Sequence, residues 1–161
     1  MHLMRRINPV WFFVILLAGV SLACSLPGLF GNASSAGEKV GGPFTLSKAA
    51  VTTSSGLTYE DLVVGDGQVA QAGDTVRATY TGYLEDGTVF DSNANSGTSF
   101  EFLLGAGQVI PGWDEGLVGM RVGGRRLLVI PPDLAYGSSG AGGVTPHDAT
   151  LTFEVTLLEI R

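Results

Sequence analysis

Strict alternation of apolar and polar residues in two separate segments most limits the folds open to this chain. From Val76 to Leu84 every second residue is apolar, aromatic or glycine, and Arg77, Thr79 and Thr81 between them face the other way. Residues 151–157 repeat the pattern, with Leu, Phe, Val and Leu separated by Thr, Glu and Thr. A period of two puts alternate side chains on opposite faces of a strand, one buried and one solvated. The chain is therefore predicted to build a sheet with one wet face.

Three further segments add to this sheet. Residues 127–130 are apolar on both faces, which predicts a central strand, and residues 57–64 and 99–104 are two further strand candidates. Directly after residues 76–84, Asp86-Gly87 indicates a tight hairpin turn, because glycine reaches positive φ without a Cβ clash.

Only the segment that begins at Pro111 is predicted to be helical. Pro111 suits a first helical position, and the two acidic residues that follow, Asp114 and Glu115, are favoured there by the helix dipole. The apolar side of this helix consists of Trp113, Leu117 and Met120. Because several glycines interrupt it, the helix needs a sheet to pack against. The predicted fold is α+β, a curled antiparallel sheet of about five strands wrapped around one short helix.

Composition excludes several classes of function. The 161 residues include 9 Lys and Arg against 15 Asp and Glu, a net charge of −6, which disfavours nucleic-acid binding. A single cysteine rules out a disulfide framework or a thiolate cluster, and with only 2 histidines in the chain most zinc sites are excluded as well. A serine hydrolase built on His147 and Asp148 rests on residue counts alone.

The N-terminus is typical of an export signal. Arg5 and Arg6 precede an apolar run over residues 10–20, and Cys24 follows shortly afterwards. The run is shorter than the about 20 apolar residues that span a bilayer. Residues 1–24 are therefore predicted to direct the rest of the chain out of the cytoplasm.

Cys24 is similar in place to the acylated cysteine of bacterial lipoproteins. Ser21 and Leu22 depart from that family, which usually carries Leu and a small residue at these places. A signal cleaved near Ala23 and an uncleaved anchor remain open beside the favoured interpretation, a lipid on Cys24 that fixes the protein to a membrane of the cell envelope.

The rest of the chain divides in two. Residues 25–54 are rich in Gly, Ser and Ala and are predicted to be a flexible linker. Residues 55–161 have the size of one domain with one core, and we expect that domain to be a monomer.

Aromatic residues from distant segments are the unusual feature of this domain. They could simply fill the core, and for Phe102 that is the favoured interpretation. Two patterns favour a pocket: an aromatic-carboxylate pair, Phe90-Asp91, and the extended stretch that enters the helix before Trp113, where backbone N–H groups are free.

Four motifs of this domain resemble those of a known protein family. They read YTGYLEDGTVFDSN, GAGQVIPGWDEGLVGMRVGG, PPDLAYG and ATLTFEVTLLEI, and together they resemble the FKBP-type peptidyl-prolyl cis-trans isomerases over residues 55–161. The resemblance implies the same curled sheet over a short helix. It also implies a pocket for a prolyl ring, with no metal, nucleotide or redox cofactor.

Carried over by position, the resemblance assigns two sets of pocket residues. The set implied in catalysis is Tyr80, Asp91, Ile110, Trp113 and Tyr136. The set implied in substrate binding is Phe90, Phe100, Val109, Val144 and Phe153. In the family, the tryptophan forms the pocket floor, the residue matching Ile110 offers its N–H, and the tyrosine matching Tyr136 donates from its hydroxyl.

The expected substrates are unfolded or partly folded exported proteins with X–Pro bonds, and macrolide inhibitors of the family are further expected ligands. Asp91 is interpreted as orienting Tyr80 rather than acting as a base. The alternative is a non-catalytic module or chaperone that holds Pro-containing partners in the same pocket.

Overall fold

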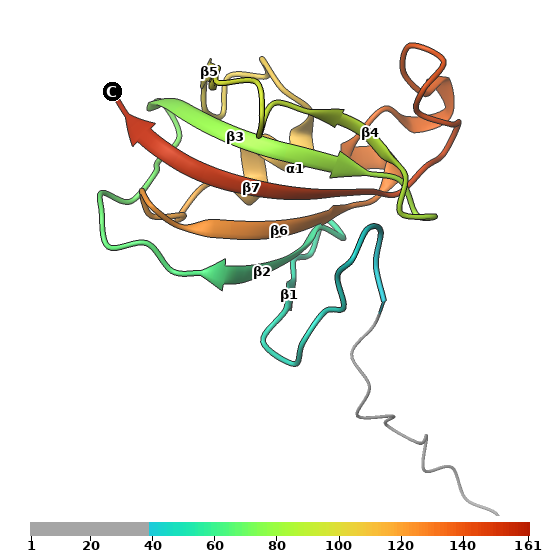
Figure 1. Ribbon diagram of the computed structural model, residues 1–161, viewed down its shortest axis with the longest axis horizontal. Coiled ribbons are helices and arrows are strands. Elements are labelled where there is room, and N and C mark those ends of the chain that lie inside the picture. The colour runs from blue at the N-terminus through green and yellow to red at the C-terminus, as the bar shows by residue number, and fades with distance from the viewer. Residues whose placement is uncertain (1–38) are drawn as a thin grey trace, which may run out of the picture. The chain divides into compact units, whose positions relative to one another are not determined.

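The computed structural model describes residues 39–161. The predicted export signal, Cys24 and the first part of the predicted linker lie outside the described residues. The described part contains seven strands and one α-helix, whose arrangement is drawn in Figure 1. Their bounds are β1 Val51–Thr52, β2 Thr58–Val63, β3 Thr75–Tyr83, β4 Val89–Ser92, β5 Phe100–Leu103, α1 Pro111–Gly116, β6 Arg125–Ile130 and β7 Leu151–Ile160. Two 3-10 turns, η1 Pro132–Leu134 and η2 Gly137–Ser139, lie between β6 and β7.

The predicted α+β fold is confirmed, a curled antiparallel sheet over one short α-helix. The strands run in the order β1-β2-β6-β7-β3-β4, and β5 pairs with the first half of β3. The sheet has seven strands in the described residues where about five were expected. Of the two additional strands, β1 has two residues and falls in the predicted linker, and β4 is the short second arm of the Asp86-Gly87 hairpin.

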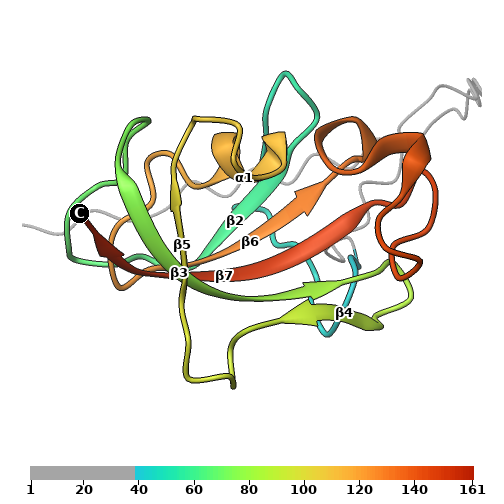
Figure 2. The ribbon, with the colours of Figure 1, turned by 90° about the horizontal axis from the view of Figure 1, so that it is seen from above.

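The alternation in the sequence corresponds to the burial of the strands. In β3 the side chains of Val76 and Ala78 are fully buried, whereas Arg77 between them is only partly covered. The central β6 buries both Leu127 and Leu128, as its two apolar faces predict. Figure 2 shows α1 against one face of the curved sheet, and the core lies between them.

Helix α1 is shorter than its apolar pattern predicts. It ends at Gly116, and Gly119 adopts a φ of +81°, a left-handed conformation that continues the chain as a turn. Leu117 and Met120 nevertheless remain buried in this turn. The apolar spacing therefore located the buried residues correctly, although the helical hydrogen bonding stops before them.

Glycine lets α1 lie directly on β6. A Cβ added to Gly112 would collide with Ile130 Cγ2, and one added to Gly116 would lie 2.7 Å from Leu128 Cδ2. Both glycines lie in α1 on either side of Trp113, so the helix that carries the indole packs closely on the sheet.

We expect Gly112→Ala to lower the free energy of unfolding by about 1–3 kcal/mol, because the added methyl overpacks a filled core. Urea denaturation measures this directly. In the matched control, Ile130→Ala removes the colliding atoms, so its combination with Gly112→Ala should destabilise less than the sum of the single changes. Additive effects would contradict the collision.

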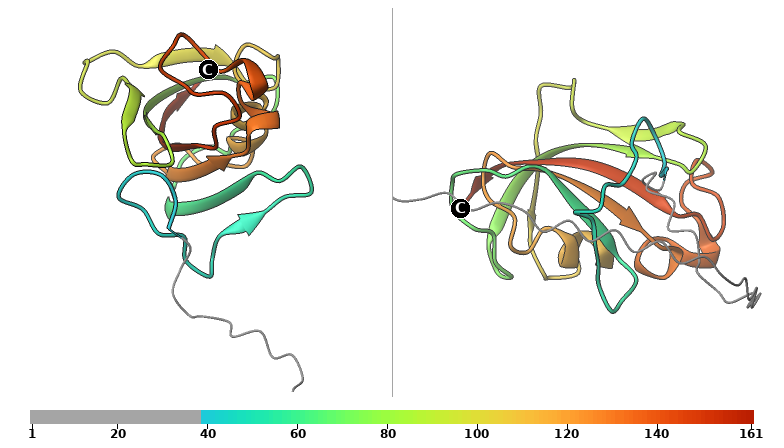
Figure 3. Two further views of the ribbon diagram at one scale, coloured as in Figure 1. Left: turned by 90° about the vertical axis from the view of Figure 1, so that its right-hand side faces the viewer. Right: turned by 90° about the horizontal axis from the view of Figure 1, so that it is seen from below.

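The described part of the predicted linker, residues 39–54, makes ordered contacts with the sheet. We call residues 39–50 the N-terminal strap; Figure 3 shows it beside the sheet. The Gly41 N–H donates to Thr152 Oγ1 over 3.1 Å, and the Phe44 ring meets Tyr83 edge-on at 5.6 Å. Leu46 is buried. Two apolar side chains in a Gly- and Ser-rich stretch thus find sites on the domain, and the folded unit begins before residue 55. Within residues 39–161 no helix is long and apolar enough to cross a bilayer.

Candidate active site

One cavity gathers most of the pocket residues that the sequence indicates. Its volume is about 370 Å³. Its lining consists of Tyr80, Asp91, Phe100, Gln108, Val109, Ile110, Trp113, Tyr136 and Phe153. These residues come from β3, β4, β5, β7, α1 and the loops before α1 and after η1. Segments far apart in the chain therefore meet at one hollow.

Trp113 forms the floor of this cavity. Its side chain is 3% exposed and belongs to the core, yet it also lines the cavity. The rings of Tyr80 and Phe153 meet the indole nearly perpendicularly, with centroids 5.0 and 5.4 Å away. Edge-to-face contacts of this kind suit the charge distribution of aromatic rings. The indole is thus held in one orientation from its edges.

A β-bulge places Phe90 and Asp91. In the β3–β4 ladder, Gly82 pairs with Asp91 and Tyr83 with Val89, so Phe90 is an extra residue. A bulge redirects the neighbouring side chains. Phe90 lies over Gly82 and packs edge-on against Phe153 at 5.5 Å, behind the lining. Asp91 instead reaches the cavity, where its Oδ2 accepts a hydrogen bond of 2.7 Å from the Tyr80 hydroxyl.

Several hydrogen-bond donors of the cavity lining have no partner in the described part of the chain, among them the buried Trp113 indole N–H. The Ile110 N–H precedes α1 and takes part in no hydrogen bond within residues 39–161, while the Ile110 carbonyl accepts from Trp113 N–H over 2.9 Å. The Tyr136 hydroxyl likewise has no partner there, and its side chain is 40% exposed. A bound carbonyl can accept from either donor.

Both tyrosine hydroxyls stay protonated well above neutral pH. Burial, followed by the hydrogen bond to Asp91, raises the pKa of Tyr80 far above its ordinary value. Burial, followed by the charge of Asp91, also raises the pKa of Tyr136. Each hydroxyl is therefore a donor at physiological pH, and Asp91 acts on both.

The sequence-based reasoning missed Gln108 and gave Asp114 too small a role. Gln108 lines the cavity, and its Oε1 accepts from the Leu103 N–H over 2.9 Å. Asp114, expected only to be favoured by the helix dipole, accepts from the N–H groups of Gly105 and Gly107, each over 2.8 Å. These bonds fix the loop that presents Ile110. The position of Gln108 directly before Val109-Ile110 was the available signal.

Two predicted binding residues lie outside the lining. Phe90 supports Phe153 from behind, and Val144 is 58% exposed on the loop between η2 and β7. That loop is closed on itself, because Ala141 and Thr145 bridge and His147 Nδ1 contacts the Ser138 carbonyl at 2.5 Å. Within residues 39–161 His147 bonds to no serine hydroxyl, so this part of the chain contains no serine–histidine pair.

The chain is similar to members of one known protein family. A family model of the FKBP-type peptidyl-prolyl cis-trans isomerases matches residues 67–158. The FK506-binding protein of Neisseria meningitidis serogroup B is 51% identical over 105 residues, 65% of this chain and 96% of that protein. FK506-binding protein 2 of Yarrowia lipolytica is 58% identical over 93 residues, 58% of this chain and 65% of that protein.

Solved structures share the fold. The crystal structure of AtFKBP13 is similar with a TM-score of 0.65 and 40% identity, over 70% of this chain and 98% of that one. FkpA from Escherichia coli is similar with a TM-score of 0.65 and 43% identity, over 71% of this chain and 53% of that one.

Proposed function

The chain belongs to the FKBP-type peptidyl-prolyl cis-trans isomerase family, and we propose that its cavity acts on X–Pro bonds of exported proteins to assist their folding. The enzyme is a peptidyl-prolyl cis-trans isomerase. The observation that supports the site assignment best is an apolar cavity with Trp113 as its floor and two free donors, the Ile110 N–H and the Tyr136 hydroxyl, at its wall.

The barrier to rotation about X–Pro arises from amide resonance and is about 18–20 kcal/mol. A planar amide has a larger dipole than a twisted one, so water stabilises the planar state more. Transfer of the bond into an aromatic cavity removes part of that stabilisation and lowers the free-energy difference between the planar and the twisted amide. No covalent bond forms or breaks on the protein.

The cavity residues act by position and charge. A prolyl ring lies against Trp113, and the Ile110 N–H and Tyr136 O–H hold the carbonyls on either side of the rotating bond. Asp91 orients Tyr80 through their hydrogen bond and sets the field near the carbonyl of the residue before Pro. It transfers no proton.

Isomerase activity is therefore expected to be independent of pH between about 5 and 8, and Asp91→Asn should lower kcat/KM about three- to tenfold without a new pH dependence. The raised pKa values of Tyr80 and Tyr136 keep both hydroxyls protonated throughout this window, so neither titrates. The assay is exchange of a short X–Pro peptide followed by NMR. A bell-shaped profile in the wild type that disappears in Asp91→Asn would show that Asp91 is a base.

The same peptide assay separates catalysis from mere binding. The full chain in non-ionic detergent should accelerate cis-trans exchange, and Tyr136→Phe, which removes one donor and keeps the ring, should lower kcat with little change in peptide affinity. A module that only holds Pro-containing partners would bind the peptide and leave the exchange rate at its uncatalysed value. Macrolides of the kind that give the relatives their names should compete with the peptide.

We place the enzyme outside the cytoplasm, anchored to a membrane of the cell envelope through a lipid on Cys24. Arg5, Arg6 and the apolar run before Cys24 support this proposal. Mass spectrometry of the protein from its host, or from a bacterial expression host, should find a diacylglyceryl adduct on an N-terminal Cys24, and Cys24→Ser should abolish it. A mature chain with a free Cys24 thiol would favour a signal cleaved near Ala23. A chain that retains residues 1–23 would favour an uncleaved anchor. Size measurement in detergent should give a monomer.

A further inference from the structure

The N-terminal strap covers the back of the cavity wall. Its Gly41 N–H donates to Thr152 Oγ1 of β7, and the Thr152 side chain is nearly fully buried. The Tyr83 ring of β3 lies against two strap residues. Phe44 meets it edge-on at 5.6 Å, and a Cβ added to Gly42 would lie 2.8 Å from Tyr83 Cδ1. The strap thus packs on β3 and β7 together.

The strand register connects these contacts to the cavity. Tyr83 pairs with Thr152, and the preceding residue, Gly82, pairs with Phe153 of β7 on one side and with Asp91 of β4 on the other. Successive residues of a strand point to opposite faces of the sheet. The strap therefore covers one face directly behind the row that carries Phe153 and Asp91 into the cavity on the other face.

The β3–β4 hairpin has little other support. In the described residues β4 pairs with β3 alone, and three of its four residues are exposed. The strap touches this hairpin again at its turn: a Cβ added to Gly41 would lie 2.5 Å from the Leu84 carbonyl oxygen, and one added to Gly87 would lie 3.6 Å from the Gly42 nitrogen. An edge arm with so few buried contacts opens easily unless another segment holds it.

From this arrangement we infer that the strap belongs to the catalytic unit, with Phe44 as a positioning residue for the isomerase reaction. Phe44 holds Tyr83 at the β-bulge opposite Val89, and the bulge in turn aims Asp91 at the Tyr80 hydroxyl. The inference rests on the proposed function of the cavity. Phe44 itself does not line the cavity and touches no substrate.

The test uses the full chain in non-ionic detergent, at a temperature where every variant is folded. Phe44→Ala should lower kcat for a short X–Pro peptide about two- to fivefold with little change in KM. Phe44→Leu keeps an apolar side chain on Tyr83 and should recover most of the loss. Gly42→Ala should reproduce the loss by another route, because its methyl displaces the strap from the Tyr83 ring.

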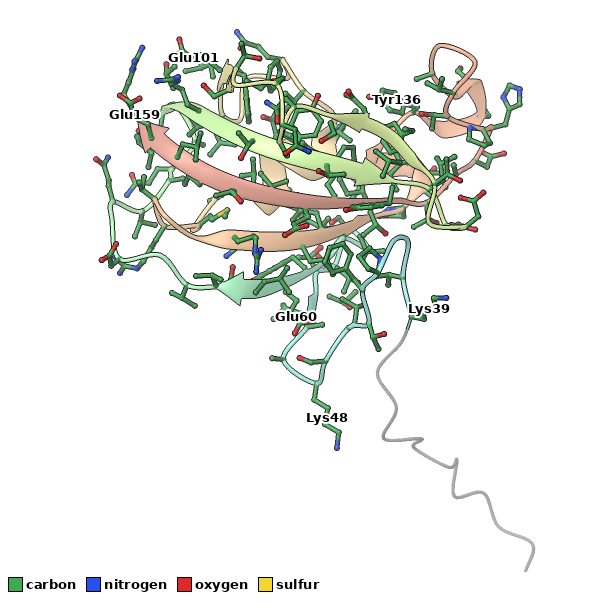
Figure 4. All side chains as sticks on the ribbon, in the orientation of Figure 1. Lys39, Lys48, Glu60, Glu101, Tyr136 and Glu159 are labelled. Carbon is green, nitrogen blue, oxygen red and sulfur yellow. The ribbon has the colours of Figure 1, made fainter. Side chains whose placement is uncertain are left out.

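Ser47→Ala is the matched control on the strap. The Ser47 N–H and hydroxyl both bind the Glu60 carboxylate of β2, a strand that contributes no residue to the cavity lining. Figure 4 shows Lys39 and Lys48 on the strap below β2, with Glu60 beside it and Tyr136 near the opposite edge of the sheet. Ser47→Ala loosens this remote attachment only and should leave kcat unchanged.

A double-mutant cycle distinguishes positioning from a merely structural role. In an Asp91→Asn background, Phe44→Ala should cause almost no further loss of kcat, because the group that it positions is already gone. In a Val109→Ala background it should cause its full loss, since Val109 lines the cavity from the loop before α1, away from the strap. A variant that only reduced the folded fraction would lose the same factor in both backgrounds.

Hydrogen exchange followed by mass spectrometry gives a readout independent of activity. Phe44→Ala should accelerate amide exchange in β4 and leave exchange in the central β6 unchanged. Wild-type kcat in Phe44→Ala, unchanged exchange in β4, or a loss of kcat that persists in full in the Asp91→Asn background would overturn the inference. Failure of the proposed function is a different outcome, in which the wild type accelerates no X–Pro peptide while exchange in β4 still responds to Phe44→Ala.

Discussion

Trp113→Ala is expected to lower kcat/KM for an X–Pro peptide by about ten- to a hundredfold, the equivalent of about 1.5–3 kcal/mol of apolar contact with the prolyl ring. It should also lower the free energy of unfolding by about 3–5 kcal/mol, because the indole is a core residue with a cavity left in its place. Trp113 is 3% exposed and contacts the rings of Tyr80, Phe102 and Phe153. The two effects are measured by peptide exchange and by urea denaturation.

A matched control separates loss of the floor from loss of stability. Leu157→Ala removes a fully buried side chain from β7 that does not line the cavity, and should destabilise by about 2–5 kcal/mol. Its kcat/KM per folded molecule should remain that of the wild type. Trp113→Leu, which retains an apolar floor, should fold better than Trp113→Ala and recover part of the activity. If Trp113→Ala were as active per folded molecule as Leu157→Ala, the indole would stabilise the core and contribute nothing to catalysis.

The sheet was predictable because its central strands obey a local rule. Period-two alternation located β3 and β7, and a run apolar on both faces located β6, since burial of a strand is recorded in its own residues. Helix α1 was placed by its proline and its apolar spacing, but its end was not, because Gly119 leaves the helix through a left-handed backbone that spacing does not encode. The hairpin at Asp86-Gly87 was predictable because the residues of a tight turn determine its backbone conformation. Gly87 adopts the expected positive φ, +88°.

The cavity was predictable only in part. Eight of its nine lining residues were assigned from the motif resemblance, and Gln108 was not. Phe90 was placed in the pocket by its neighbour Asp91, yet the bulge in β4 turns the two side chains to different places. A bulge depends on how two strands pair, which single-strand patterns do not contain.

Contacts between distant segments account for what else was missed. The N-terminal strap reads as linker because Phe44 and Leu46 are too few to form a pattern, and only the sheet supplies their sites. The burial of one arginine could likewise not be predicted, because nothing in the sequence distinguishes Arg125 from Arg126. In the structure they differ completely: Arg125 pairs with Glu154 at the surface, while the Arg126 side chain is 7% exposed.

Arg126→Met is expected to lower the free energy of unfolding by about 2–4 kcal/mol. Its guanidinium donates to both Asp61 oxygens, over 2.7 and 3.0 Å, and to the carbonyls of Gly116 and Val118, over 2.8 and 3.3 Å. It also lies 4.5 Å from the centroid of the Tyr59 ring. Methionine fills much of the space but leaves the two carbonyls at the end of α1 without donors. Asp61 is 35% exposed and can be rehydrated, which keeps the loss below that of a fully buried pair.

Arg125→Met is the control, because it makes the same change one residue earlier and breaks only a surface ion pair with Glu154, an effect of less than about 1 kcal/mol. Urea denaturation of both variants should therefore give well-separated midpoints with similar slopes. Equal midpoints would mean that the bonds from Arg126 to α1 contribute nothing net. Those bonds hold the end of the helix whose first turn carries Trp113. Arg126→Met should therefore lose activity per folded molecule at a lower temperature than Arg125→Met, although Arg126 does not line the cavity.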